Sequence, residues 1–289
     1  MSFSLFADSG CNLPARHLEE HRISVIPFPM VIDGRETESP KYPDGFDGGS
    51  YYTRLKAGME VKTSLINSET FYGAFRPVLA AGQDVLYVGI SSGITGTIQS
   101  ASIAAAQLAG EFPERTIRIV DSLGAGLGTG LIVLRAADYR AQGLSAEQAA
   151  VKLDYDVENL CEYFTVDDLM FLKNTGRVSG AAAAIGTMLQ LKPMLRGDEE
   201  GHIVVCGKIR GRKKAIDELT AIYQKKAVNP ERQRIAISHG NCLEEALALA
   251  DRLRAVAQPK ELILSMHEPL TGAHVGPGML AVFFFGTGR

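Results

Sequence analysis

Short apolar runs alternate with helical periods along the first half of the chain. Strands are expected at 3–7, 24–31, 85–90 and 116–120, and helices at 50–57, 68–81, 97–109 and 130–142. The polar segment 33–49, rich in Gly, Pro and acidic residues, is typical of an exposed loop. Strands and helices that alternate at this spacing predict a parallel sheet covered on both faces, with ligands at the carboxyl ends of its strands.

The pattern changes after about residue 155. Strands are expected at 163–171, 202–208, 234–238, 261–266 and 279–285, and helices at 181–191, 213–224 and 243–256. We therefore predict an α/β fold in two domains. The first, residues 1–157, is a three-layer domain around the parallel sheet, and the second, 158–289, is an α/β domain with a mixed sheet.

The stretch from Val85 to Gly96 predicts a binding site. A buried strand runs into serines and glycines and then into a helix, so the glycines permit close backbone approach and the first helical N–H groups lack partners. With the hydroxyls of Ser91, Ser92 and Thr95, these donors suit an anion such as a carboxylate. An ordinary serine-capped turn is the alternative interpretation.

The same residues fit a second motif. Gly89-Ile90-Ser91-Ser92-Gly93 matches G-x-S-x-G, the nucleophile elbow of hydrolases, in the strand-turn-helix context that the elbow requires. A nucleophilic Ser91 needs a histidine base and an acid, which His239 or His274 with Asp121 or Asp168 would supply. A serine hydrolase or esterase is therefore the alternative function.

Composition narrows the classes of protein. With 289 residues, 46% of them hydrophobic and 22% charged, the chain is typical of a globular protein, and its net charge of −3 disfavours general nucleic-acid or membrane-surface binding. No apolar run reaches the roughly 20 residues of a membrane span, and no signal peptide is visible. The four cysteines are widely scattered, which favours a reduced, cytoplasmic protein and indicates no metal site.

No nucleotide cofactor is indicated. The glycines of 124–130 alternate strictly, so neither dinucleotide nor P-loop spacing fits, and we interpret the run as a helix or turn packed closely on the sheet. Polar side chains also collect at 8–10, 62–64 and 272–278, between regular elements. A basic run between 208 and 214 is either a solvated helix start or a docking surface for an acidic partner.

Seven segments, in order, resemble the DegV family of fatty-acid-binding proteins. Asp8-Ser9-Gly10-Cys11-Asn12-Leu13-Pro14 is similar to the family's D-S-x-x-D-L-P, Lys62-Thr63-Ser64 to part of T-S-Q-P-S, and the stretch 90–101 to I-S-S-x-L-S-G-T-Y-Q-S-A. Residues 172–179, 191–195, 210–215 and 272–278 also match. The resemblance covers nearly the whole chain.

The resemblance implies a protein that holds a long-chain fatty acid in an apolar tunnel, with its carboxyl group at the domain junction. It is not an enzyme by itself, and it presents the acyl chain to a separate ATP-dependent kinase subunit that forms the acyl phosphate. The carboxyl ligands it implies are Thr63, Ser64, Ser91, Ser92, Gly93 and His274, and the partner-binding residues are Arg177, Arg210 and Arg212.

Some positions depart from the family pattern. Leu65-Ile66-Asn67 replaces the continuation of the T-S-Q-P-S segment, Asn12 stands in place of Asp, and Ala273 precedes His274 in place of Thr. The hydroxyls of the expected anion site are retained. Their altered neighbours leave the shape of the head-group pocket and the preferred ligand open.

Overall fold

The computed structural model describes residues 3–178 and 191–289. The first of its two larger sheets is parallel. The strand order is β2-β1-β6-β7, with β1 at Ser4–Asp8, β2 at Ile23–Ile26, β6 at Val85–Gly89 and β7 at Ile117–Asp121. Side chains alternate between the two faces, so Phe6 and Tyr87 belong to one core while Leu5 and Leu86 belong to another. The predicted parallel sheet is confirmed.

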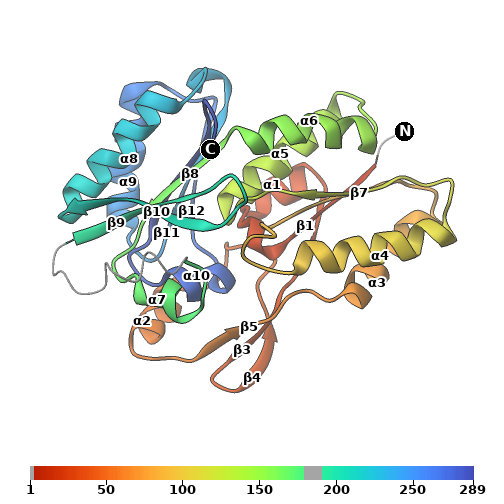
Figure 1. Cartoon of the computed structure of the whole chain (residues 1–289), viewed down its shortest axis with the longest axis horizontal. Helices are drawn as coiled ribbons and strands as arrows, with labels where there is room; N and C mark the ends of the chain where they lie inside the picture. Colours follow the sequence, from red (N-terminus) through yellow and green to blue (C-terminus); the bar gives the residue numbers. More distant parts are fainter. Residues whose placement is uncertain (1–2, 179–190) are drawn as a thin grey trace.

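Helices cover both faces of this sheet (Figure 1). The helices α3 (Ser68–Ala80) and α4 (Thr97–Glu111) share the core of Phe6 and Tyr87, and α5 (Leu127–Ala141) and α6 (Ala146–Glu158) share that of Leu5 and Leu86. A capping box of Ser145 and Gln148 begins α6, a helix that the sequence pattern did not predict. Two short segments follow β1, η1 (Ser9–Cys11) and α1 (Ala15–Glu20).

The second of the two larger sheets is mixed, as predicted. Its order is β10-β9-β8-β13-β11-β12, and only the β11–β12 pair is parallel. The strands are β8 (Leu160–Thr165), β9 (Leu191–Gly197), β10 (Ile203–Arg210), β11 (Arg234–His239), β12 (Glu261–Met266) and β13 (Leu280–Phe285). The helices α8 (Arg212–Lys226) and α9 (Leu243–Val256) cover its outer face, and η3 spans Pro230–Arg232.

Helix α5 lies between the two sheets. It contacts β1 and β6 on one side and β11 and β13 on the other. The glycine run explains this close fit, because a Cβ on Gly128 would lie 1.9 Å from the Glu162 carboxylate and one on Gly130 would lie 2.6 Å from the Cys11 carbonyl oxygen. The predicted close packing of residues 124–130 is confirmed.

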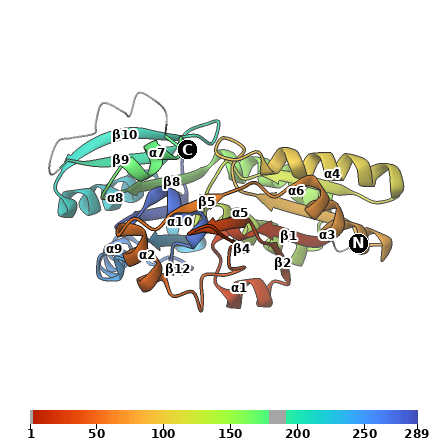
Figure 2. The same cartoon turned by 90° about the horizontal axis from the view of Figure 1, so that it is seen from below.

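A small antiparallel sheet, β4-β3-β5, lies beside both larger sheets (Figure 2). It is formed by β3 (Pro29–Ile32), β4 (Arg35–Glu38) and β5 (Val61–Thr63). The prediction of a single strand at 24–31 was wrong, because Pro27 lies between β2 and β3 and Pro29 begins β3. The loop predicted at 33–49 also contains β4, whose residues are all exposed and polar and so carry no strand-like alternation.

Three short helices complete the fold near the small sheet, α2 (Gly48–Lys56), α7 (Met170–Asn174) and α10 (Pro269–Val275). The strand predicted at 163–171 ends early, because the Asp168 carboxylate accepts a hydrogen bond from Met170 N–H and a helix follows. The helix predicted at 181–191 lies outside the described residues except for Leu191, which begins β9. None of the described helices has the length and apolar character needed to cross a membrane.

Candidate functional site

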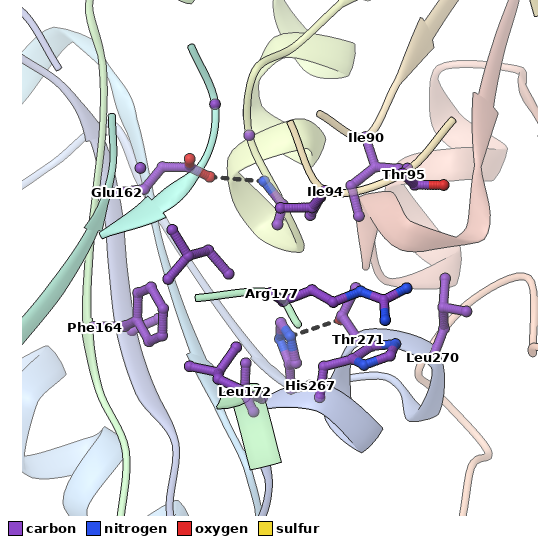
Figure 3. Close-up of a pocket in the computed structure, with 18 of the residues that line it drawn as sticks. Ile90, Ile94, Thr95, Glu162, Phe164, Leu172, Arg177, His267, Leu270 and Thr271 are labelled. Atoms are coloured by element: carbon purple, nitrogen blue, oxygen red, sulfur yellow. Dashed lines mark hydrogen bonds between the residues drawn. The ribbon is translucent and has the colours of Figure 1, made fainter. Parts of the chain in front are cut away.

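A cavity lies where the carboxyl ends of the parallel strands meet the mixed sheet and α10 (Figure 3). Most of its wall is apolar, and both sheets contribute. The apolar side chains that line it are those of Phe28, Leu65, Ile90, Ile94, Leu123, Ala125, Phe164, Leu172, Ile203, Leu270, Val275, Met279, Ala281 and Phe283. The position agrees with the prediction that ligands bind at the carboxyl ends of the parallel strands.

Polar side chains from separate elements also face the cavity. Thr63 ends β5, His274 lies in α10, and Arg177 follows α7. The Thr63 Oγ1 and His274 Nε2 atoms are 2.9 Å apart and share a hydrogen bond. Ser64 and Thr95 line the same cavity. Of the residues expected to bind a carboxyl group, the structure thus places Thr63, Ser64 and His274 on the wall.

The electrostatics of this group favour an anion. Burial, together with the neighbouring Arg177 charge, lowers the pKa of His274 to about 4, so the imidazole is neutral at pH 7. Its Nδ1 atom is buried without a hydrogen-bond partner among the described residues. Burial also lowers the pKa of Arg177, whose charge is paired with no carboxylate in that same part of the chain. A bound carboxylate would satisfy both groups.

Ser91, Ser92 and Gly93 do not line this cavity. The Ser91 side chain is about 1% exposed, and its hydroxyl donates to the Gly201 carbonyl at 2.8 Å and accepts from Gly93 N–H at 3.0 Å. Ser92 is exposed, and its backbone N–H donates to the Asp121 carboxylate. The start of this loop therefore packs against the turn between β9 and β10. Thr95 of the same loop faces the cavity.

The arrangement of a serine hydrolase is not assembled around Ser91. Of the two candidate bases, His239 Nδ1 accepts from Cys242 N–H and His274 bonds to Thr63. The Asp121 carboxylate accepts from the backbone of Ser92 and Leu123, and Asp168 from Met170. In the described chain, no imidazole is hydrogen-bonded to Ser91. The geometry gives the nucleophile hypothesis no support.

The comparisons with known proteins agree over the whole chain. The family model described as "Uncharacterised protein, DegV family" matches residues 2–287. The chain belongs to the DegV family. A DegV domain-containing protein of Clostridium perfringens is 36% identical over 288 residues, which cover 98% of this chain and 97% of that protein. The family predicted from the motifs is confirmed.

Solved DegV structures share the fold. A DegV family protein from Thermus thermophilus, described as fatty acid binding, superposes with a TM-score of 0.86 at 28% identity and covers 99% of this chain and 100% of that one. DegV from Bacillus subtilis, described as a fatty acid binding protein, superposes with a TM-score of 0.85 at 29% identity and the same coverage. Both likenesses span the parallel and the mixed sheet.

The opening DegV motif positions the loop beside the cavity. The buried Asp8 carboxylate accepts hydrogen bonds from Gly10 N–H, from the Tyr87 hydroxyl at 2.6 Å and from Ile90 N–H at 3.0 Å. Burial raises the pKa of Asp8 to about 6 despite these donors. Asp8 therefore fixes the end of β6, from which the loop carrying Thr95 begins.

The residues expected to meet a partner lie in different settings. Arg210 is exposed at the end of β10. The Arg212 side chain is only about 17% exposed and makes a bidentate ion pair with Glu245, with its shortest contact at 2.6 Å. Arg177 lines the cavity, as described above. Of the three, Arg210 alone presents an exposed, unengaged side chain in the described structure.

The sequence pattern did not predict a buried polar network that contributes His267 and Thr271 to the cavity wall. His267 Nε2 shares a hydrogen bond with the Thr271 hydroxyl at 2.7 Å, and His267 Nδ1 one with the Ser238 hydroxyl at 3.0 Å. The Glu268 carboxylate accepts from Thr271 N–H and from Leu270 N–H. A His-Glu pair after a strand is the only local signal for it. Among the described residues, no group of His, Cys, Asp and Glu has the geometry of a metal site.

Proposed function

We propose that this DegV family chain binds a long-chain fatty acid in the cavity, with the carboxylate held by Arg177, Thr63 and His274. The observation that carries the proposal is a half-buried guanidinium beside a neutral imidazole on the wall of a mostly apolar cavity. The DegV proteins of Thermus thermophilus and Bacillus subtilis, described as fatty acid binding, support it.

Ser64 and Thr95 complete the proposed head-group site, because their side chains reach the same cavity. Ser91, Ser92 and Gly93 act in this proposal through the loop, whose shape they fix by their contacts with Gly201 and Asp121. The arrangement puts Thr95, rather than Ser91, beside the ligand.

Head and tail contribute differently to the proposed affinity. Each buried methylene contributes about 0.8 kcal/mol, so a tail of ordinary fatty-acid length contributes on the order of 10 kcal/mol before the cost of association. A hydrogen bond to a charged carboxylate contributes about 1.5–3 kcal/mol. The tail therefore supplies most of the affinity, and the polar group selects a carboxylate.

Mass spectrometry tests the proposal directly. The protein is purified from a bacterial host without detergent or added lipid, and the small molecules released on denaturation are identified. We expect a stoichiometric long-chain fatty acid, whose length and saturation the spectrum would report. Protein that is empty, and that also takes up no added fatty acid, would contradict the proposal.

We further infer that the chain presents its ligand to a separate ATP-dependent kinase subunit. In that reaction a carboxylate oxygen attacks the γ-phosphorus of ATP, ADP leaves, and the product is the acyl phosphate, so this chain supplies substrate and not the catalytic groups. The exposed Arg210 is the docking residue that the geometry favours, and Arg212, held by Glu245, orients the start of α8 beside it.

Charge reversal tests the docking surface. We expect Arg210→Glu to slow acyl phosphate formation with the kinase and to leave fatty acid affinity unchanged. Lys225→Glu, also exposed but at the far end of α8, is the matched control. An equal effect of both variants, or a parallel loss of fatty acid binding in Arg210→Glu, would contradict this assignment.

A further inference from the structure

One charged residue lines the cavity on the side away from the proposed head-group site. Figure 3 shows Glu162 on the opposite side of the cavity from Thr95, Arg177 and Leu270. Glu162 lies in β8 and is about 7% exposed. A buried acid on the wall of an apolar cavity is unusual, because burial of an unpaired charge is costly.

The register of β8 and β13 gives the order of the residues along the cavity wall. Glu162 pairs with Phe283, and Phe164 pairs with Ala281 two residues along. Met279, Ala281 and Phe283 all line the cavity, as alternate residues on one face of a strand do. At about 3.4 Å per residue, this face runs about 14 Å from Met279, close in the chain to His274, to Phe283 and Glu162.

The end at Glu162 is closed by a buried ion pair. The Glu162 carboxylate accepts from Ala125 N–H at 2.9 Å and from the Arg289 guanidinium at 3.3 Å. Arg289, only about 3% exposed at its side chain, also donates to the carbonyls of Leu123, Val157 and Asp198. Burial raises the pKa of Glu162 to about 7, and Arg289 opposes that rise.

Backbone packs closely around this carboxylate. A Cβ on Gly124 or on Gly197 would lie 2.9 Å from a Glu162 oxygen, and both glycines line the cavity. The Glu162 carboxylate therefore lies in close contact with the backbone at both glycines and has little room to move aside for a ligand.

We propose that Glu162, held by Arg289, is the end stop that sets the longest acyl chain the cavity accepts. The inference rests on the proposed fatty acid site, since it places the carboxylate near His274 and the ω end against Glu162. Each methylene added to an acyl chain that does not yet reach Glu162 buries more apolar surface and strengthens binding. A longer chain must displace a buried, fully engaged ion pair, and breaking such a pair is strongly unfavourable.

The test is the chain-length profile of binding. Saturated fatty acids that lengthen by two carbons at a time compete with a fluorescent fatty acid for the whole protein. We expect the wild-type Kd to tighten by about fourfold per methylene, the equivalent of about 0.8 kcal/mol, and then to stop improving at one length. The double variant Glu162→Ala/Arg289→Leu removes both charges together and should move that limit to longer chains.

Two further variants separate size from charge and guard against a misfolded protein. Glu162→Gln keeps the size of the stop, so its limit should stay at the wild-type length. Phe283→Leu keeps the ion pair and trims the neighbouring side chain, so its limit should also stay at the wild-type length; a longer limit there would make Phe283 the stop, whether or not the double variant folds.

The outcomes separate the two proposals. A wild-type protein that binds no fatty acid of any length contradicts the proposed function and the end stop with it. A wild-type protein with a clear limit that is unchanged in the double variant, or that lengthens in Phe283→Leu, overturns the end stop alone. A limit that moves equally in Glu162→Gln overturns the steric role and leaves a purely electrostatic one.

Discussion

At the scale of single residues, Arg177 is the group that selects a carboxylate in the function we propose. It lines the cavity next to His274 and pairs with no carboxylate in the described ranges. We expect Arg177→Gln to weaken fatty acid binding by about 10- to 100-fold, the equivalent of one lost hydrogen bond to a charge. Binding of a primary alcohol of the same length should change little, as measured by fluorescence competition. An equal loss for both ligands would argue against a carboxylate contact.

Glu268, at the start of α10, predicts a pH dependence of stability. Burial raises its pKa to about 7 from an ordinary value of 4.5, even though hydrogen bonds from Thr271 and Leu270 favour the charged form. Between these pH values the folded chain holds a proton that the unfolded chain releases. The contribution of Glu268 to the free energy of unfolding is therefore fully present below about pH 4.5 and is lost as the pH rises through about 7.

Comparison with Glu268→Gln isolates this effect from the titrating histidines. We expect the free energy of unfolding of the wild type, relative to the variant, to fall by about 3 kcal/mol across that range. Urea denaturation at several pH values measures the difference. A difference that stays constant with pH would show that Glu268 keeps one protonation state throughout.

At the scale of elements, the glycines of α5 are fixed by the packing of that helix between two sheets. In Gly130→Ala the new Cβ would lie 2.6 Å from the Cys11 backbone carbonyl, which cannot move aside as a side chain would. We expect a loss of about 1–3 kcal/mol in the free energy of unfolding, measured by chemical denaturation.

The matched control is Gly73→Ala in the middle of α3. An added Cβ there meets nothing within 4 Å, so the helix should gain about 0.5–1 kcal/mol from the better helix former. Similar effects of the two substitutions would contradict the packing explanation for α5.

Local features of the fold could be predicted from the sequence, whereas contacts between distant residues could not. Helix 243–256 and strand 261–266 were predicted with the bounds that the structure has, because apolar periodicity is a local property. The partner of Ser91 is Gly201, 110 positions away, and nothing local distinguishes Ser91, which binds that turn, from Thr95, which faces the cavity. Contacts across such distances depend on the tertiary fold.

Other parts of the site were hidden for the same reason. In the sequence, Glu162 is a single polar residue next to a predicted strand. Only the fold shows that the Arg289 guanidinium donates a hydrogen bond to its carboxylate. The resemblance to the DegV family implied that Arg177 faces a partner, whereas the structure places it on the cavity wall. The family motifs pointed to loops that line the cavity but not to the direction of each side chain.

At the scale of the whole molecule, both sheets share one core. Phe3, Leu5 and Leu86 of the parallel half belong to the same buried cluster as Ala236 and Phe283 of the mixed sheet, and α5 joins them. The boundary at 157–158 remains a prediction. Because the halves share their largest core through α5, we expect one cooperative thermal transition, measured by calorimetry.

A bound fatty acid should raise that single transition, because a ligand that binds only the folded state stabilises it in proportion to the logarithm of its concentration. Two separate transitions, with only one responding to ligand, would contradict a shared core.

The hydrogen bond between Thr63 and His274 joins residues 211 positions apart, one from the small sheet and one from α10. Neither side chain keeps its partner if the other changes alone. Over evolutionary time the two positions should therefore be inherited as a unit: lineages that lose the imidazole should also replace the threonine, and an alignment that shows them varying independently would mean that each serves a purpose of its own.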